Sequence, residues 1–279
     1  MKCRQVTKLS LSARYDFGHN GHNIASVANR ISIPILMDQF LRSPQSLTDE
    51  EIEGIEKQSL RALFVAACNL GFDAYEIFRQ STDSPKDIGE DTTREMMERL
   101  GGYNLNQRIL GNVDYRRAHY IVLPELSIRQ ALFVDSKAEK DGSCTATLQM
   151  SQLSMKVTYV NKSTGDEVVE KGHLKPISSH GGKPFLTTTL LVHYEYELSG
   201  VDFILKETKL AAIPNGKLQH AYNPDSKKTI WQAGRQAPSL GEDFRVRLNF
   251  ARLSLLKGWR VQSISYDAST KSFDAVWKD

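Results

Sequence analysis

The chain has 279 residues, of which 40% are hydrophobic and 25% are charged, and its formal net charge at pH 7 is only +3. This length and composition are typical of a soluble protein with one large core, or of one domain with an extension. No apolar run approaches the length of a membrane span, and the first residues lack the apolar core of a signal peptide, so we expect neither a membrane protein nor a secreted one.

The three cysteines indicate a reducing compartment. Cys3, Cys68 and Cys144 are odd in number and widely spaced, and no Cys-x-x-Cys pair occurs. This pattern is typical of free thiols and predicts a cytoplasmic protein. Because the net charge is so small, a surface that binds nucleic acid must come from local clusters of arginine and lysine and not from a global excess.

The first 45 residues are interpreted as an N-terminal extension, and residues 46–279 as one domain. Residues 15–23 are rich in glycine and asparagine and are typical of a loop. His19 and His22 in that loop have no cysteine or further histidine nearby, so a solvated loop fits them better than a metal site. The extension could pack on the core, join a subunit interface or touch DNA.

Three helices are predicted between residues 46 and 100. Thr48 and Glu51 have the spacing of a capping box at the start of a long helix, and apolar residues follow at helical intervals until Gly71. A second helix is expected over residues 72–78, and a third over residues 90–100, where two glycines end it. We interpret the first two helices as structural or oligomerising elements.

Two short apolar runs, residues 119–123 and 132–134, are predicted to form strands with a turn between them. The second strand places Asp135 and Lys137 two residues apart, on the same side of the pleat. If the strands are adjacent, Asp114 comes close to Asp135, and two carboxylates and an ammonium group share one small site.

These three groups are the ones that metal-assisted phosphodiester hydrolysis requires. Carboxylate oxygens hold Mg²⁺, which keeps several of its own waters. The metal polarises the phosphate and lowers the pKa of a bound water, and a nearby lysine positions that water and offsets charge in the transition state. Taken alone, however, an Asp-x-Lys pattern fits a strand end with a surface salt bridge better.

The chain after residue 137 is predicted to alternate loops with strands. Residues 148–159 are interpreted as a helix that passes into a strand, and residues 186–198 and 202–213 as a β-hairpin. Three polar loops are expected, at residues 138–143, 178–183 and 217–241. The last of them is long enough to indicate a functional loop.

Residues 244–250 have the alternation of a strand with one buried face. Their apolar side chains alternate with Arg245, Arg247 and Asn249, so both arginines lie on the face opposite the core. Two parallel guanidinium groups at this spacing can each bond to O6 and N7 of a guanine, a contact worth about 1–3 kcal/mol of base discrimination. A solvated strand face is the other interpretation of this pattern.

Several separated segments together resemble the SfiI family of type II restriction endonucleases, within the PD-(D/E)xK nuclease superfamily. They occur in the same order, from roughly residue 46 to the C-terminus, and the separation of the two aspartates is similar as well. The segments are residues 56–61, 113–117, 134–138, 148–155, 220–225, 241–242, 245–247 and 250–253. A more distant resemblance, to the BglI enzymes, is carried by residues 209–216 and 245–247.

This resemblance implies an α/β fold with a central mixed β-sheet flanked by helices, which holds both catalysis and DNA recognition. It implies that Asp114 and Asp135 are Mg²⁺ ligands, with the carbonyl group of Ser136 as a third ligand. Lys137 would orient the attacking water. Val113 stands where the family motif has its first proline, which is not a ligand.

The resemblance also suggests roles outside this triad. Glu90 is similar to an acidic residue that supports the metal site from an early helix, although it also fits an acidic helix N-terminus that interacts with the helix dipole. For DNA binding, the resemblance favours Arg245 and Arg247 as base-reading residues. We expect Arg235 and Lys140, in two of the polar loops, to contact DNA as well.

The activity that follows is Mg²⁺-dependent cleavage of both strands of duplex DNA at a GC-rich interrupted palindrome, leaving 5′-phosphate and 3′-hydroxyl ends. A palindromic site calls for a two-fold symmetric protein, so a homodimer or homotetramer is expected, together with a DNA methyltransferase that protects the host DNA. Two alternatives stay open. One is a repair or junction nuclease of the same fold that selects DNA by shape, and the other is a catalytically inactive DNA-binding protein.

Overall fold

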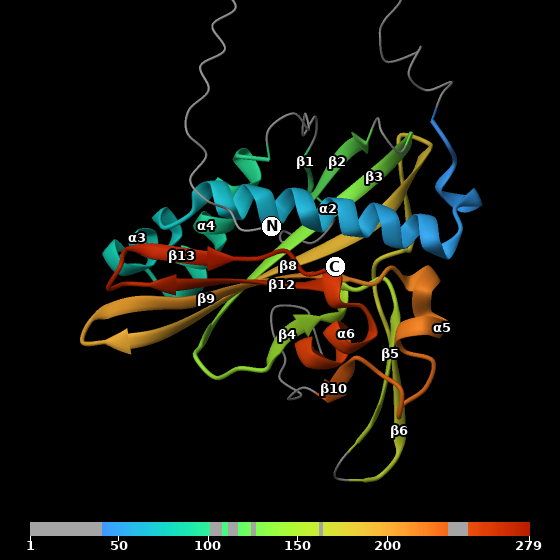
Figure 1. The fold of residues 1–279 in the computed structure, drawn as a ribbon. Helices are drawn as coiled ribbons and strands as arrows, with labels where there is room; N and C mark the ends of the chain where they lie inside the picture. The colour runs from blue at the N-terminus through green and yellow to red at the C-terminus, as the bar shows by residue number, and fades with distance from the viewer. Residues whose placement is uncertain (1–40, 101–107, 111–116, 124–126, 162–163, 234–244) are drawn as a thin grey trace, which may run out of the picture.

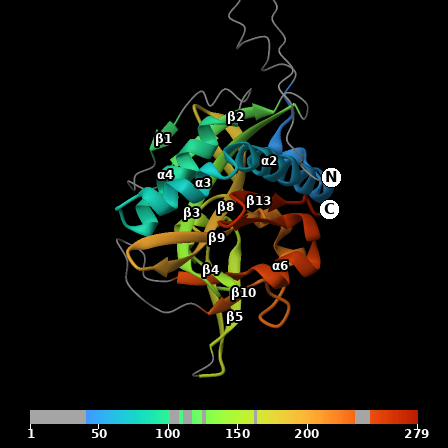
Figure 2. The same ribbon diagram turned by 60° about the vertical axis from the view of Figure 1, so that its left-hand side comes forward.

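The structure is a computed structural model that describes residues 41–100, 108–110, 117–123, 127–161, 164–233 and 245–279 (Figure 1). These residues form a central mixed β-sheet with helices on one face and a smaller sheet on the other (Figures 1 and 2). In the part of the chain that the structure describes, no helix combines the length and the apolar character that a membrane crossing needs.

Three helices form the layer on one face of the sheet. They are α2 (Asp49–Leu70), α3 (Asp73–Gln80) and α4 (Pro85–Glu98), preceded by the 3₁₀ turn η1 (Pro44–Ser46). The predicted capping box is confirmed, because the Glu51 N–H donates to Thr48 Oγ1 at 3.3 Å and the Thr48 N–H donates to Glu51 Oε2 at 2.9 Å. The predicted end is confirmed too, since Gly71 caps α2 with a φ of +58°.

The central sheet holds the strand that carries the candidate site. Its strands, in spatial order, are β1 (Arg108–Leu110), β2 (Arg117–Leu123), β3 (Ile128–Lys140), β8 (Lys183–Ser199), β9 (Asp202–Ile213), β12 (Val261–Asp267) and β13 (Ser272–Ala275), and β7 (Ile177–His180) also pairs with β8. The β3–β8 pair is parallel and the other pairs described are antiparallel. The predicted β8–β9 hairpin is confirmed.

A second, smaller sheet and a hairpin complete the described strands. The second sheet has the order β10 (Trp231–Ala233), β11 (Arg245–Asn249) and β4 (Thr145–Gln149), and the hairpin joins β5 (Lys156–Val160) to β6 (Glu167–Lys171). The short helical elements around them are η3 (Met150–Gln152), η4 (Gly216–Leu218), α5 (Gln219–Tyr222), α6 (Phe250–Leu256) and η5 (Gly258–Arg260). In Figure 1 the β5–β6 hairpin projects away from the body of the molecule.

The alternation of side chains along β8 separates the two faces of the central sheet. The Tyr194 ring lies under α4, where a Cβ on Gly89 would be 3.1 Å from it. The neighbouring His193 points to the opposite face, where its ring lies 5.3 Å from the ring of Phe250 at the start of α6. Because residues in register share a face, Ala138 lies on the helix-covered face and Lys137 on the other.

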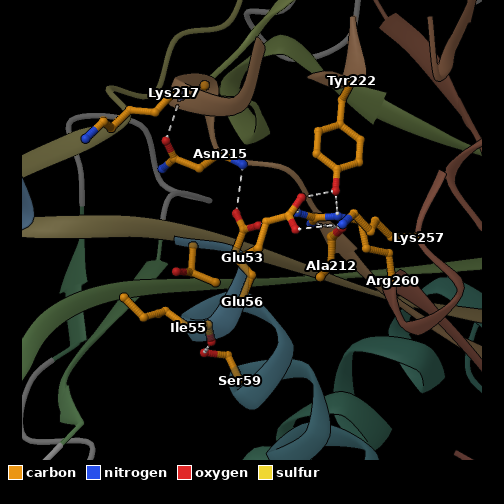
Figure 3. A network of polar contacts seen from close by, with 12 residues as sticks. Glu53, Ile55, Glu56, Ser59, Ala212, Asn215, Lys217, Tyr222, Lys257 and Arg260 are labelled. Atoms are coloured by element: carbon orange, nitrogen blue, oxygen red, sulfur yellow. Dashed lines mark hydrogen bonds and ion pairs between the residues drawn. The ribbon is translucent and has the colours of Figure 1, made fainter. Parts of the chain in front are cut away.

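A buried polar network fastens α2 to the sheet and to the C-terminal part of the chain (Figure 3). Arg260 and Glu56 are both fully buried, and Arg260 Nη2 donates to Glu56 Oε2 at 2.8 Å. The other carboxylate oxygen of Glu56 accepts from the Asn215 N–H at 2.7 Å, and Arg260 Nε donates to the Tyr222 hydroxyl at 2.7 Å. Burial without such partners would be costly, so every member of this network constrains the others.

Several local predictions are wrong because strand pairing overrides them. Residues 138–140 are not a loop, since β3 continues beside β8 as far as Lys140. Residues 148–155 are not a helix, because β4 pairs with β11 and is followed only by the turn η3. The proposed 178–183 loop contains β7 and its turn. Within the predicted 217–241 loop, Trp231 is almost fully buried in β10.

Candidate active site

Asp135 and Lys137 lie together on β3, on the face turned away from the helices. Lys137 Nζ is 2.7 Å from Asp135 Oδ2, and about a quarter of each side chain is exposed, 26% for Lys137 and 23% for Asp135. Oδ2 is itself buried and makes no hydrogen bond in the part of the chain that the structure describes, so this contact is an ion pair without hydrogen-bond geometry. A buried anionic oxygen of this kind is a suitable ligand for a hard cation such as Mg²⁺.

Among the described residues, the backbone around this pair has a strand neighbour on one side. β2 flanks β3 only as far as the pairing of Ala118 with Phe133, and beyond that point β8 is the only described strand beside β3. β2 begins at Arg117, three residues after Asp114, which lies outside the described part of the chain. Among the described residues alone, no cluster of three or more acidic, histidine or cysteine side chains could hold a metal.

Gln152 is a site residue that sequence reasoning missed. Its Nε2 donates to Asp135 Oδ1 at 2.6 Å, and its Oε1 accepts from the Gln149 N–H at 2.8 Å. Gln152 lies in the segment 148–155 that carried the family resemblance, but a helix was predicted there. The turn η3 directly follows β4, and from this turn the side chain reaches Asp135 on β3.

Two rows of charged side chains continue from the site across the same face of the sheet. In register, one row holds Lys137, His193 and Lys209, and the next holds Glu139, Glu195 and Glu207. His193 is fully buried, with Nε2 3.6 Å from Glu139 Oε2 and Nδ1 3.7 Å from Glu195 Oε1. Lys209 Nζ is 3.1 Å from Glu207 Oε2 and also contacts Glu195. Carboxylates therefore flank both His193 and Lys209.

These contacts favour the charged form of two members of the rows, Glu139 and Lys209. Burial alone would raise the pKa of Glu139, but His193 and the Ser143 hydroxyl, which donates to Glu139 Oε2 at 2.8 Å, outweigh burial and lower that pKa to about 2. Burial likewise opposes the charge of Lys209, but Glu195 and Glu207 outweigh it and raise the pKa of the Lys209 ammonium.

The second sheet has one apolar face and one polar face. Val246 and Leu248 are fully buried, and Arg245 and Arg247 alternate with them on the other side, which confirms the predicted strand. Residues directly opposite one another share a face, so this side also carries Gln149, Thr147 and Gln232. We call these five residues, Arg245, Arg247, Thr147, Gln149 and Gln232, the polar face. Arg245 Nε on it is buried and has no hydrogen-bond partner within the described residues.

The remaining predicted site residues either lie away from Asp135 and Lys137 or fall outside the described residues. Glu90 is half exposed on α4, with its Oε1 3.6 Å from Lys86 Nζ, and α4 covers the face of the sheet opposite Asp135. Lys140 is the exposed last residue of β3, and strand alternation puts it on the helix-covered face. Asp114 and Arg235 lie outside the described residues. The structure therefore brings Asp135 and Lys137 together but does not bring Glu90 or Lys140 to them.

Comparison with known proteins gives the family of the chain. The family model for the type II restriction enzyme SfiI matches residues 58–264. The type II restriction enzyme SfiI of Streptomyces fimbriatus is 34% identical to this chain, and the match covers 84% of this chain and 92% of that enzyme. The chain belongs to the SfiI family of type II restriction enzymes.

Solved structures agree with this membership. The crystal structure of tetrameric SfiI bound to cognate DNA matches with a TM-score of 0.74 and 30% identity, over 85% of this chain and 93% of that one. The structure of the restriction endonuclease BglI bound to its DNA recognition sequence matches with a TM-score of 0.60 and 16% identity, over 83% and 93%, and shows the shared fold alone. The predicted family, fold class and enzyme class, a type II restriction endonuclease, are thus confirmed.

Proposed function

We propose that this member of the SfiI family uses Mg²⁺ to cut both strands of duplex DNA. The proposal is carried by one observation: Lys137 Nζ lies 2.7 Å from an Asp135 oxygen that is buried and has no hydrogen bond to any described residue. Asp135, Asp114 and the Ser136 carbonyl would hold the metal, and all three lie within the residues that match the family. When bound, Mg²⁺ supplies a polarised phosphate and a bound water of lowered pKa.

Lys137 has a defined part in this chemistry. An ammonium group has three N–H donors, and the Asp135 carboxylate occupies only one direction around Lys137 Nζ. The remaining donors can hold a water and a phosphate oxygen, so that the water attacks phosphorus in line with the bond to the 3′ oxygen. That bond then breaks and leaves 5′-phosphate and 3′-hydroxyl ends. The ammonium charge offsets the negative charge that develops in the transition state.

The polar face is the proposed base-reading surface. Arg245 and Arg247 present guanidinium groups two residues apart on one side of β11, a spacing that suits two guanines. Gln149, Thr147 and Gln232 add amide and hydroxyl groups that can donate to or accept from base edges. The two arginines support a GC-rich target, and the interrupted palindrome is what the family resemblance implies. Contacts from Arg235 and Lys140, and metal support from Glu90, stay predictions from the sequence.

The same proposal extends to assembly and cellular setting. The SfiI structure is that of a tetramer on cognate DNA, and a palindromic site matches a protein with two-fold symmetry. We therefore infer a homodimer or homotetramer that acts in the cytoplasm. A DNA methyltransferase of matching specificity would be needed in the same cell, because an unguarded nuclease of this kind cuts the DNA of its own host.

Digestion of a large, fully sequenced phage DNA tests the activity directly. Wild type, Asp135→Ala, Lys137→Met and a matched control, Asp274→Ala, are compared with Mg²⁺ and with EDTA. Asp274 is an exposed aspartate on the edge strand β13, far along the chain from the candidate site. Wild type and Asp274→Ala are expected to give discrete fragments with Mg²⁺ but not with EDTA, and Asp135→Ala and Lys137→Met are expected to give none. Mapping the fragment ends gives the recognition site.

Other outcomes would favour the alternative functions. A smear in place of discrete fragments would indicate a nuclease that selects DNA by shape. Sequence-specific binding without cleavage would indicate an inactive DNA-binding protein. Cleavage by Asp135→Ala at the wild-type rate would remove Asp135 from the proposed metal site.

A further inference from the structure

The side chain of Gln152 joins Asp135 to the second sheet. Its Nε2 donates to Asp135 Oδ1 at 2.6 Å, and its Oε1 accepts from the Gln149 N–H at 2.8 Å. A backbone N–H can only donate, so the amide oxygen has to face Gln149 and the amide nitrogen has to face Asp135. Both ends of the Gln152 amide are therefore used, in one orientation.

The backbone on which Gln152 stands has little room to shift. The Leu174 N–H donates to the carbonyl oxygen of Leu153 at 3.0 Å, directly after Gln152. One residue further, a Cβ on Gly216 would lie 2.1 Å from the carbonyl oxygen of Ser154, so the two backbones are in close contact. The residues directly after Gln152 are therefore anchored, and β4 lies on its other side.

The other end of this connection lies on the polar face. Gln149 is the last residue of β4 and stands directly opposite Arg245 of β11. Arg247 pairs with Thr147 two residues earlier on the same strand. Because β4 and β11 are paired, a displacement of β11 would be passed to β4, and the hydrogen bond of the Gln149 N–H links β4 to Gln152.

We propose that Gln152 is a positioning residue that couples base reading by the polar face to the orientation of Asp135. The inference rests on the proposed function, in which Asp135 holds the metal. With the correct bases bound, Gln152 would hold Asp135 Oδ1 so that Oδ2 stays directed at Lys137 and the metal position. With a wrong base, the displaced β4 would break the hydrogen bond from the Gln149 N–H to Gln152 Oε1, and the amide would no longer be held against Asp135. Specificity then acts on the cleavage step as well as on binding.

The test compares wild type with Gln152→Met, Gln152→Glu and a matched control, Gln219→Met. Gln219 also holds a backbone N–H with its side chain, that of Lys156 at 2.8 Å, but on α5 and without contact to Asp135 among the described hydrogen bonds. Each protein is given the mapped site and a duplex with one base pair of it changed. Single-turnover cleavage is measured in Mg²⁺, and duplex binding by fluorescence anisotropy over a range of Ca²⁺ concentrations, with a gel to show that the duplex stays intact.

Gln152→Met is expected to cut the correct site about 10–100-fold more slowly, the usual cost of losing a partner of a metal ligand. It should need more Ca²⁺ for half-maximal binding, and the ratio of correct-site to altered-site rates should narrow. Gln152→Glu keeps an acceptor for the Gln149 N–H but sets a second carboxylate against Asp135, so it should be slowed as well. Gln219→Met should lose stability but keep the wild-type rate and ratio.

Two results would overturn the inference while leaving the proposed function intact. If Gln152→Glu cuts the correct site at the wild-type rate, Gln152 only caps the turn η3. If Gln152→Met keeps the wild-type ratio of correct-site to altered-site rates, Gln152 does not couple base reading to cleavage. If Gln152→Met does not fold, as judged by circular dichroism, Gln152→Glu alone decides by its rate and its rate ratio. A wild-type protein that cuts neither duplex contradicts the proposed function itself, together with the inference.

Discussion

Arg260 and Glu56 are both fully buried, and each provides the opposite charge that the other needs. The Arg260 guanidinium lies between two aromatic rings, with its centre 4.3 Å from the centroid of the Tyr222 ring and 4.4 Å from that of Trp259. Burial disfavours its charge, but Glu56 and the Tyr222 hydroxyl outweigh burial and raise the pKa of Arg260. A buried ion pair adds little to the free energy of unfolding relative to an apolar pair of the same volume. Removing only one of its partners, however, lowers that free energy strongly.

Arg260→Met is therefore expected to lower the free energy of unfolding by about 3–5 kcal/mol, because it leaves the Glu56 carboxylate buried without its charge partner. The double variant Glu56→Met, Arg260→Met should be markedly more stable than this single variant. Urea unfolding of the single and double variants measures both effects. A double variant as unstable as Arg260→Met would show that the network matters through its shape and not through its charges.

Glu139 gives the stability of the protein a dependence on pH. Its pKa in the folded protein is about 2, below the ordinary value of 4.5. A depressed carboxyl pKa stabilises the fold above the ordinary pKa, and this contribution is lost as the pH falls from about 4.5 towards 2. His193 and Ser143 are the partners that stabilise the ionised form.

Glu139→Gln should therefore be less stable than wild type at pH 7 and should show a flatter loss of stability between pH 4.5 and 2. The reason is that glutamine has no proton to take up over this range. Urea unfolding midpoints at closely spaced pH values measure the difference. Parallel pH curves for the two proteins would show that Glu139 does not carry this dependence.

At the scale of elements, β11 combines a buried face and a proposed recognition face in five residues. Val246 and Leu248 pack into the core, and Arg245 and Arg247 project from the other side. Strands β4 and β10 on either side fix the position of β11, and they continue the polar face with Thr147, Gln149 and Gln232. A recognition surface on a paired strand is better defined than one on a loop.

Arg247→Ala is expected to relax specificity at one base pair of each half-site, with a loss of about 1–3 kcal/mol of discrimination there. Arg247→Lys should relax the same position while it keeps more affinity, because lysine retains the charge but not the two-pronged geometry. Cleavage of a duplex set with every base at each position of the mapped site measures this. Equal loss on all duplexes would indicate that Arg247 binds a phosphate instead.

At the scale of the whole molecule, the two sheets carry different parts of the candidate site. The central sheet carries Asp135 and Lys137, and the second sheet carries the polar face, with Gln152 between them. In the proposed function, one chain presents one catalytic pair and one reading surface. Cutting both strands of the proposed palindrome then calls for at least two chains related by two-fold symmetry.

The mass in solution is accordingly expected to be two or four times the 31.4 kDa of one chain. Size-exclusion chromatography with light scattering measures it, with and without the mapped duplex. A tetramer should also cut a plasmid with two sites faster than a plasmid with one site, because both duplexes can be held at once. A monomer that persists on the duplex would contradict the two-fold arrangement.

Short-range patterns in the sequence determined several features of this protein. The capping box of Thr48 and Glu51, the alternation in residues 244–250 and the two-residue spacing of Asp135 and Lys137 each depend on neighbours within one element. Local geometry sets the outcome in these cases, because helix caps and strand alternation follow from backbone dihedral angles alone. The Asp135–Lys137 pair and the arginine face could be predicted for this reason, and the family resemblance rested partly on the same residues.

Only the tertiary structure decided which distant residues meet. Gln152 reaches Asp135 across 17 positions of sequence, and Arg260 reaches Glu56 across 204. β3 extends to Lys140 because β8 lies beside it, although the local composition favours a loop. The periodicity of side chains within one segment cannot predict such pairings, because they arise when whole sheets and helices pack against one another. In the candidate site, the Asp135–Lys137 pair follows from local strand geometry. The contact of Gln152 with Asp135 depends on the tertiary fold.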